Sequence, residues 1–238
     1  MRAPFVAALL LLPGLSVHAA APADRGVAAR LDTLEGLLQQ EQIDEAIVGT
    51  EELYRAFPDV APVQLLAGRL KFYQGDYQGA VTLLERSLAA FGADTPREPA
   101  VLSLARGALE VTEGYRAVEG EHFIFRTPPG KDQLLAPYAL EALEHAYDRI
   151  GAVFGYHPRR KIVVDVLPSA AALAKISPLT EEAIETSGTI ALSKYGRLMI
   201  TSPKALWRGY PWLDTLAHEY VHLLITERSR NRVPVWLQ

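Results

Sequence analysis

Two histidines and a glutamate stand together in the sequence His218-Glu219-x-x-His222, within the stretch DTLAHEYVHLLI. On an α-helix, residues four positions apart lie about 40° apart around the axis, so the two imidazoles project from one face and can share one metal ion. Glu219 lies about 100° from His218 and would reach a water on that ion rather than the ion itself. This spacing on a helix is typical of a Zn²⁺ site.

These residue types suit hydrolysis at a zinc ion. Neutral imidazoles bind Zn²⁺ and leave it a good Lewis acid, and the ion lowers the pKa of its bound water towards neutrality. A nearby carboxylate can take a proton as the water attacks a carbonyl and then pass it to the leaving amine. The surrounding segment is apolar, and burying three unpaired polar groups there would be costly. We therefore predict His218 and His222 as zinc ligands and Glu219 as the catalytic general base and acid.

A third ligand does not follow within the same helix, although a catalytic zinc usually takes three from the protein. Ile225 and Arg228 stand where one class of zinc peptidase, the metzincins, would carry glycine and histidine, so that class is excluded. Glu227 is five residues past His222, about 140° around the axis, and points away from the ion. We expect Glu227 to lie at a solvated end of the helix.

The remaining polar candidates are weaker. His122, His145 and His157 each stand alone on a strand, a helix face or a loop, and structural or solvated roles are expected for them. Asp214 lies one turn before His218, where it could orient the imidazole through a hydrogen bond. Capping of the helix start is the alternative role for Asp214.

Strands and helices alternate around these residues. Segments rich in β-formers and bounded by turn residues predict strands at 121–127, 161–168, 186–192 and 197–203. Apolar residues at helical spacing predict helices at 135–153 and 211–227, with a short helix between the second and third strands. A turn at Lys194-Tyr195-Gly196 joins the last two strands. Residues 119–238 are therefore predicted to form an α+β domain.

Residues 26–118 carry helical patterns only. Setting Ala80 on Ala46 gives an internal offset of 34 residues, and Gly68 and Ala80 would let two antiparallel helices approach closely. With this period the region resembles a tetratricopeptide repeat, capped by a helical stretch at 101–115. Such stacks form concave surfaces that bind proteins, and a docking spacer is the other use of so short a stack. A pair of helical hairpins without repeat ancestry is the alternative.

The N-terminus and the composition bear on location. Residues 1–19 place Arg2, the apolar run Phe5 to Leu12 and a small-x-small site in the order of a signal peptide, with a buried helix as the alternative. We expect an exported chain, periplasmic or extracellular, without a transmembrane segment after cleavage.

The 238-residue chain has no cysteine, which excludes a disulfide framework and a thiolate metal site. Its net charge of −4 gives no electrostatic footprint for nucleic acid.

Residues 121–238 resemble the gluzincins, the thermolysin-like zinc metallopeptidases, and more closely the bacterial peptidase MA-like domain proteins. The resemblance is carried by DTLAHEYVHLLI and by RVPVWLQ at 232–238. It implies a zincin-like domain in which His218 and His222 bind Zn²⁺ and Glu219 is the general base. In gluzincins a glutamate on the next helix is the third ligand, and here it is expected just beyond Gln238, in a longer protein. A strand that edges the cleft pairs with substrate in that family, and 188–192 or 197–201 could do so here.

The function implied is zinc-dependent hydrolysis of peptide bonds in a peptide or protein substrate. A catalytically inactive scaffold or protein-binding module, with tetratricopeptide repeats and a peptidase-like domain, is the alternative. A hydrolase for another amide, such as one in cell-wall material, is a third. With only two imidazoles, the 238 residues alone are expected to bind zinc weakly and to be inactive.

Overall fold

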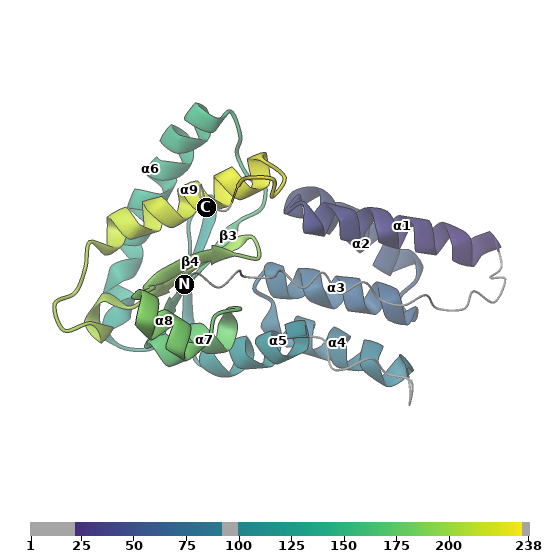
Figure 1. The fold of residues 1–238 in the computed structure, drawn as a ribbon, viewed down its shortest axis with the longest axis horizontal. Coiled ribbons are helices and arrows are strands. Elements are labelled where there is room, and N and C mark those ends of the chain that lie inside the picture. Colours follow the sequence, from purple (N-terminus) through teal and green to yellow (C-terminus); the bar gives the residue numbers. More distant parts are fainter. Residues whose placement is uncertain (1–21, 92–99, 235–238) are drawn as a thin grey trace, which may run out of the picture.

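The computed structural model describes residues 22–91 and 100–234 (Figure 1). The expected signal peptide at 1–19 and the motif residues 235–238 lie outside the described residues. The described chain combines helices with a small mixed sheet, which confirms the predicted α+β class.

Within the described residues 22–91 and 100–111, five helices form the N-terminal part, and each packs against the next along the chain. They are α1 (Pro22–Gln39), α2 (Ile43–Ala56), α3 (Ala61–Tyr73), α4 (Tyr77–Phe91) and α5 (Ala100–Val111). The closest approach is between α3 and α4, where a Cβ added to Gly68 would lie 2.8 Å from Leu84 Cγ. The absence of a side chain at Gly68 therefore allows the two helices to touch, as the sequence predicts.

A five-stranded sheet follows, in the order β1-β2-β3-β5-β4. The strands are β1 (Arg116–Glu119), β2 (Phe123–Thr127), β3 (Ile162–Leu167), β4 (Ala191–Lys194) and β5 (Arg197–Thr201). β2, β3 and β5 run parallel, and the outer strands β1 and β4 pair antiparallel to their neighbours. The predicted strands are found in part, whereas β1 has no counterpart among them.

One predicted strand is partly wrong. The segment 186–192 was expected to be extended, but Glu181–Ser187 forms helix α8. Thr180 caps the start of this helix by accepting a hydrogen bond from the Ala183 backbone N–H, and Gly188 ends it with a φ of 70°. Because Gly188 takes the left-handed conformation, the chain leaves the helix there, and the strand begins only at Ala191.

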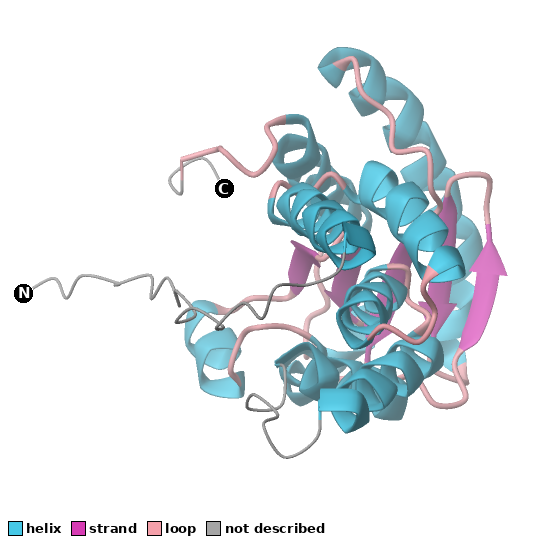
Figure 2. Cartoon of the chain, turned by 90° about the vertical axis from the view of Figure 1, so that its right-hand side faces the viewer, coloured by secondary structure: helices cyan, strands magenta, loops and turns pink. Residues whose placement is uncertain are grey.

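The remaining helices surround the sheet: η2 (Lys131–Leu135), α6 (Ala136–Phe154), α7 (Ala170–Ile176), η3 (Pro203–Ala205) and α9 (Trp212–Arg228). α6 and α9 cover one face, where Val164 and Leu198 meet Leu143 and Leu224. Figure 2 shows the strands lying among helices. No described helix is long and apolar enough to cross a lipid bilayer.

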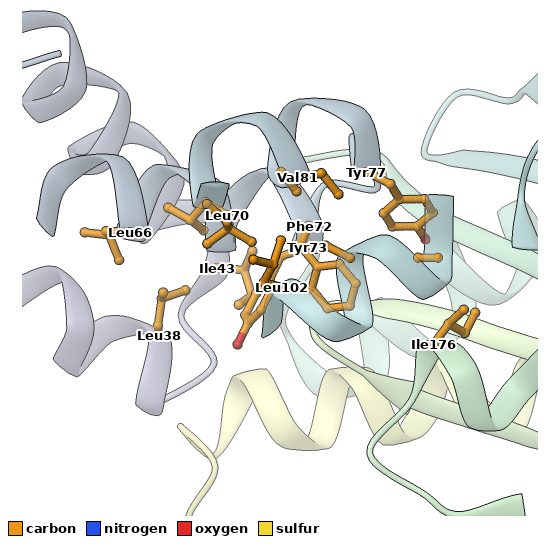
Figure 3. Close-up of a cluster of buried hydrophobic side chains, with 14 of the residues drawn as sticks. Leu38, Ile43, Leu66, Leu70, Phe72, Tyr73, Tyr77, Val81, Leu102 and Ile176 are labelled. Atoms are coloured by element: carbon orange, nitrogen blue, oxygen red, sulfur yellow. The ribbon is translucent and has the colours of Figure 1, made fainter. Parts of the chain in front are cut away.

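The N-terminal helices share a core with the other face of the sheet. Ile176 of α7 belongs to the same buried cluster as Leu70 and Phe72 of α3 (Figure 3). Met199 of β5 is also part of this cluster. The side chain of Val163 on β3 reaches the turn after α3, where a Cβ on Gly75 would lie 3.0 Å from it. The helical part is therefore packed onto the sheet rather than tethered to it.

A buried ionic cluster lies between the helices and the sheet. Asp165 of β3 accepts hydrogen bonds from Arg126 Nε at 2.8 Å and Arg126 Nη2 at 2.9 Å, a bidentate pair. Tyr77 of α4 donates its hydroxyl to the same carboxylate and accepts from Arg197. Asp165 and Arg197 are fully buried, so this network joins α4 to three strands where water cannot compete.

Candidate metal and catalytic site

Helix α9 places the three candidate residues. Its apolar side chains Leu216, Tyr220, Leu223 and Leu224 are buried against the sheet and α6, at the helical spacing that the sequence predicts. The helix begins after Pro211 without a side-chain cap, so the capping role expected for Asp214 is wrong. Asp214 is exposed.

The imidazoles of His218 and His222 converge. Their Nε2 atoms lie 2.9 Å apart, and the ring planes are inclined at 81°. Two nitrogen ligands of a tetrahedral zinc ion stand about 3.3 Å apart, so a small rotation of one ring would fit the pair to a single ion. Partial burial, and then the neighbouring His218, lower the pKa of His222, which favours the neutral form that binds metals.

Glu219 lies beside this pair and is 9% exposed. Burial raises the pKa of its carboxyl group, while His218 and the backbone N–H of Ser193 act in the opposite direction. A carboxylate with a raised pKa is a better proton acceptor near neutral pH. Ser193 belongs to β4, so the carboxyl group of Glu219 lies beside this strand.

A cleft of about 370 Å³ opens along α9 and β4, and Glu219 and His222 are among its lining residues. β4 is an edge strand, and the two-residue turn at Tyr195-Gly196 pairs Lys194 with Arg197 and Leu192 with Met199. Alternate residues of an antiparallel edge strand turn their main-chain groups outward. The main-chain groups of Ala191 and Ser193 therefore point away from β5, toward the cleft. This direction agrees with the effect of the Ser193 backbone on Glu219.

The register shows which of the two candidate strands, 188–192 or 197–201, has a free side. β5, at 197–201, lies between β3 and β4, so its main-chain groups are used on both sides. Only β4 has a free side, and it begins at Ala191 rather than at Gly188.

The cleft has a wall that the sequence does not predict. Glu41, in the turn between α1 and α2, lines the cleft and is 6% exposed. Its Oε1 lies 3.3 Å from Nζ of Lys194 on β4. No local pattern identifies this contact, because 153 positions separate the two residues and only the docking of the helices on the sheet brings them together.

The expectation for Glu227 is wrong. Its side chain is 2% exposed, forms an ion pair with Arg160, and accepts a hydrogen bond from Tyr156 Oη at 2.9 Å. Arg160 also donates to Asp44 of α2 at 3.0 Å, and Gln42 donates to the Glu227 backbone oxygen at 2.8 Å. Helical geometry turns Glu227 away from His222, although both residues line the cleft. Its carboxyl group meets Tyr156 and Arg160, which precede β3, instead of bulk solvent.

The other histidines stay apart from this site. His122 accepts or donates a hydrogen bond with Glu144 at 2.7 Å and stacks on Tyr147, and His157 packs near Gly151. His145 lies on α6 beside a separate shallow depression. Over residues 22–91 and 100–234, no group of three or more His, Cys, Asp or Glu side chains is arranged to hold a metal. The described residues thus bring together two candidate metal ligands, His218 and His222, and one candidate base, Glu219.

Comparison with known proteins adds no assignment: no family model, no curated protein and no solved structure matches this chain.

Proposed function

We propose that this protein is an exported zinc-dependent metallopeptidase of the gluzincin kind, with a tetratricopeptide-like helical stack before its catalytic domain. The proposal rests on one arrangement. The Nε2 atoms of His218 and His222 lie 2.9 Å apart, next to the buried carboxylate of Glu219. His222 and Glu219 line a cleft that runs along the edge strand β4.

In this proposal His218 and His222 hold Zn²⁺ as neutral imidazoles. Zinc bound there supplies a Lewis acid and a water of lowered pKa. Glu219 accepts a proton from the attacking water at a carboxylate oxygen and delivers it to the nitrogen of the leaving amine. Its burial favours this role because a desolvated carboxylate binds a proton more readily.

The substrate would be an extended polypeptide. The outward N–H and C=O groups of Ala191 and the outward C=O of Ser193 can form ladder hydrogen bonds with a peptide main chain, as an added strand does. Because Ser193 contacts Glu219, a peptide paired along β4 would have its backbone beside the base. Main-chain pairing carries no sequence preference, so the strand edge positions the substrate and the rest of the cleft selects it.

The test is made on the complete natural protein with an unfolded protein substrate. Glu219→Gln should abolish turnover while zinc stays bound, because the amide keeps the shape of the carboxylate but cannot accept the proton. Glu182→Gln, on the exposed surface of α8, is the matched control and should leave turnover unchanged. Full activity of the Glu219→Gln protein would refute the assigned base.

A catalytically inactive scaffold is the second candidate, because the described residues hold only two metal ligands. It predicts a complete protein that binds protein partners and contains no metal. Metal analysis of the purified protein separates the two functions: about one zinc per chain supports the peptidase, and none supports the scaffold.

A further inference from the structure

Four large apolar side chains are exposed at one end of the molecule. Trp207 is 99% exposed and follows Leu206 in the loop between β5 and α9, whereas Leu134 and Tyr138 lie at the start of α6. The loop and the start of α6 are adjacent, because Lys204 Nζ lies 2.6 Å from Asp132 Oδ2 and Ser202 donates to Asp132 Oδ1 at 2.8 Å. We call these four residues the Trp207 tip.

The loop that carries Trp207 is anchored on both sides. Tyr210 and Trp212 pack against the core between the sheet and α9, and the Tyr210 hydroxyl donates to the Thr201 backbone oxygen. Between these anchors the chain turns at Gly209, which has a φ of 60° and donates its N–H to the Leu206 oxygen at 3.1 Å. The aromatic residues after the turn are thus drawn inward, while Leu206 and Trp207 are held outward.

Cationic side chains border the tip. Lys131, Lys204 and Arg208 are exposed. Lys204 is paired with Asp132, but Lys131 and Arg208 have no ion-pair partner within the described part of the chain. The exposed acids nearest in sequence are Glu141 and Asp214, and Glu141 lies one helical turn after Tyr138, beside the same shallow depression. A projecting tryptophan and leucine with unpaired cations beside them match the chemistry of a membrane interface, where an indole ring sits at the headgroup level and cations meet lipid phosphates.

We propose that the Trp207 tip docks this protein on the surface of an anionic lipid membrane. Leu206 and Trp207 enter the headgroup region, Leu134 and Tyr138 lie against it, and Lys131 and Arg208 contact lipid phosphates. The inference is independent of the peptidase proposal, because none of these six residues lines the cleft that holds Glu219 and His222.

The position of the tip sets the orientation on the membrane. In Figure 1 the yellow-green loop before α9 forms one end of the long axis, and helices α1 and α2 lie at the other end. A protein docked through the tip therefore presents its N-terminal helices away from the lipid. The cleft beside β4 and the second half of α9 stays open to solvent.

The test is co-sedimentation of the full chain with vesicles, and phosphatidylglycerol-containing vesicles are compared with pure phosphatidylcholine. We expect binding to the anionic vesicles that weakens as NaCl is raised, since salt screens the cationic contacts. Trp207→Ala should weaken partition roughly tenfold, and Arg208→Glu should weaken it further at low salt. Val153→Ser is the matched control: Val153 is 84% exposed near the other end of α6, and its loss should change nothing.

Direct insertion is read from tryptophan fluorescence with brominated lipids. Quenching should be strong in the natural chain and largely lost in Trp207→Phe, which leaves Trp212 and Trp236 in place. The apolar run at 5–12 is present in every variant, so binding through it would persist in Trp207→Ala and would overturn the proposal. Equal vesicle binding by Trp207→Ala and Val153→Ser would do the same. The proposal would also be overturned if the protein did not bind vesicles but formed a dimer through Trp207, because the tip would then contact a second copy.

Discussion

Nε2 of His218 lies 2.9 Å from Nε2 of His222, one turn later on α9. The two rings therefore direct a nitrogen toward each other, beside a cleft that His222 and Glu219 line. Two converging donors define where a cation would sit. They leave most of its coordination to water or to further ligands.

The first prediction concerns metal affinity. The 238-residue chain should bind zinc weakly, with an affinity that falls at least about tenfold in His218→Ala or His222→Ala, because each change removes one of two imidazole donors. His145→Ala, which alters a histidine on α6, should have no effect. Isothermal titration calorimetry with a competing chelator measures the affinities. Tight stoichiometric binding would mean that a third ligand lies within the 238 residues.

The second prediction concerns the buried pair at the end of the site helix. Glu227→Ala should lower the free energy of unfolding by about 1–3 kcal/mol, because the buried Arg160 would lose one of its two carboxylate partners and keep only Asp44. Urea denaturation gives the value. Glu52→Ala is the control: its pair with Arg30 is exposed on both sides, and its loss should cost about 0–1 kcal/mol. Equal losses would contradict the buried assignment of Glu227.

The third prediction tests the register of β4. Leu192→Pro removes an N–H that pairs with Met199 and should destabilise the fold by at least about 1–3 kcal/mol. Ser193→Pro removes an outward N–H on an edge strand, which tolerates proline, so its cost should be clearly smaller. Thermal denaturation compares the two variants.

The same pair of variants separates stability from activity. If the protein is a peptidase, Ser193→Pro should reduce kcat/KM although it folds, because it deletes the backbone N–H that acts on Glu219. A Ser193→Pro protein as unstable as Leu192→Pro would mean that the outward and inward positions have been exchanged.

The fourth prediction concerns the contact between α3 and α4. Gly68→Ala should destabilise by about 1–3 kcal/mol, because the added Cβ would lie 2.8 Å from Leu84 Cγ and 3.2 Å from the Leu84 backbone nitrogen. Gly36→Ala on α1 meets nothing within 4 Å and should stabilise by about 0.5–1 kcal/mol, since alanine favours the helix. Differential scanning calorimetry of both variants shows whether each substitution raises or lowers the stability of the fold. A neutral Gly68→Ala would show that the helices can separate there without cost.

Several features follow from local sequence alone. The spacing of His218, Glu219 and His222 determines that they share one region of a helix, since the helical repeat is a property of the backbone. Apolar periodicity places α6 and α9 to within a residue or two, and the Tyr195-Gly196 turn predicts the hairpin of β4 and β5. Gly68 likewise predicts a close helix contact, because only glycine leaves that space free.

Tertiary structure decided the rest. Helical geometry predicts that Glu227 turns away from the histidines, but it cannot show that Arg160 and Tyr156 surround its carboxyl group. Glu41 enters the cleft only because the α1–α2 turn docks beside β4, a contact between residues 153 positions apart. The sheet order likewise leaves β4 with a free side and buries β5. Spacing along the chain determines which side chains share a face, whereas packing between distant segments determines whether that face meets solvent, a charge or a cleft.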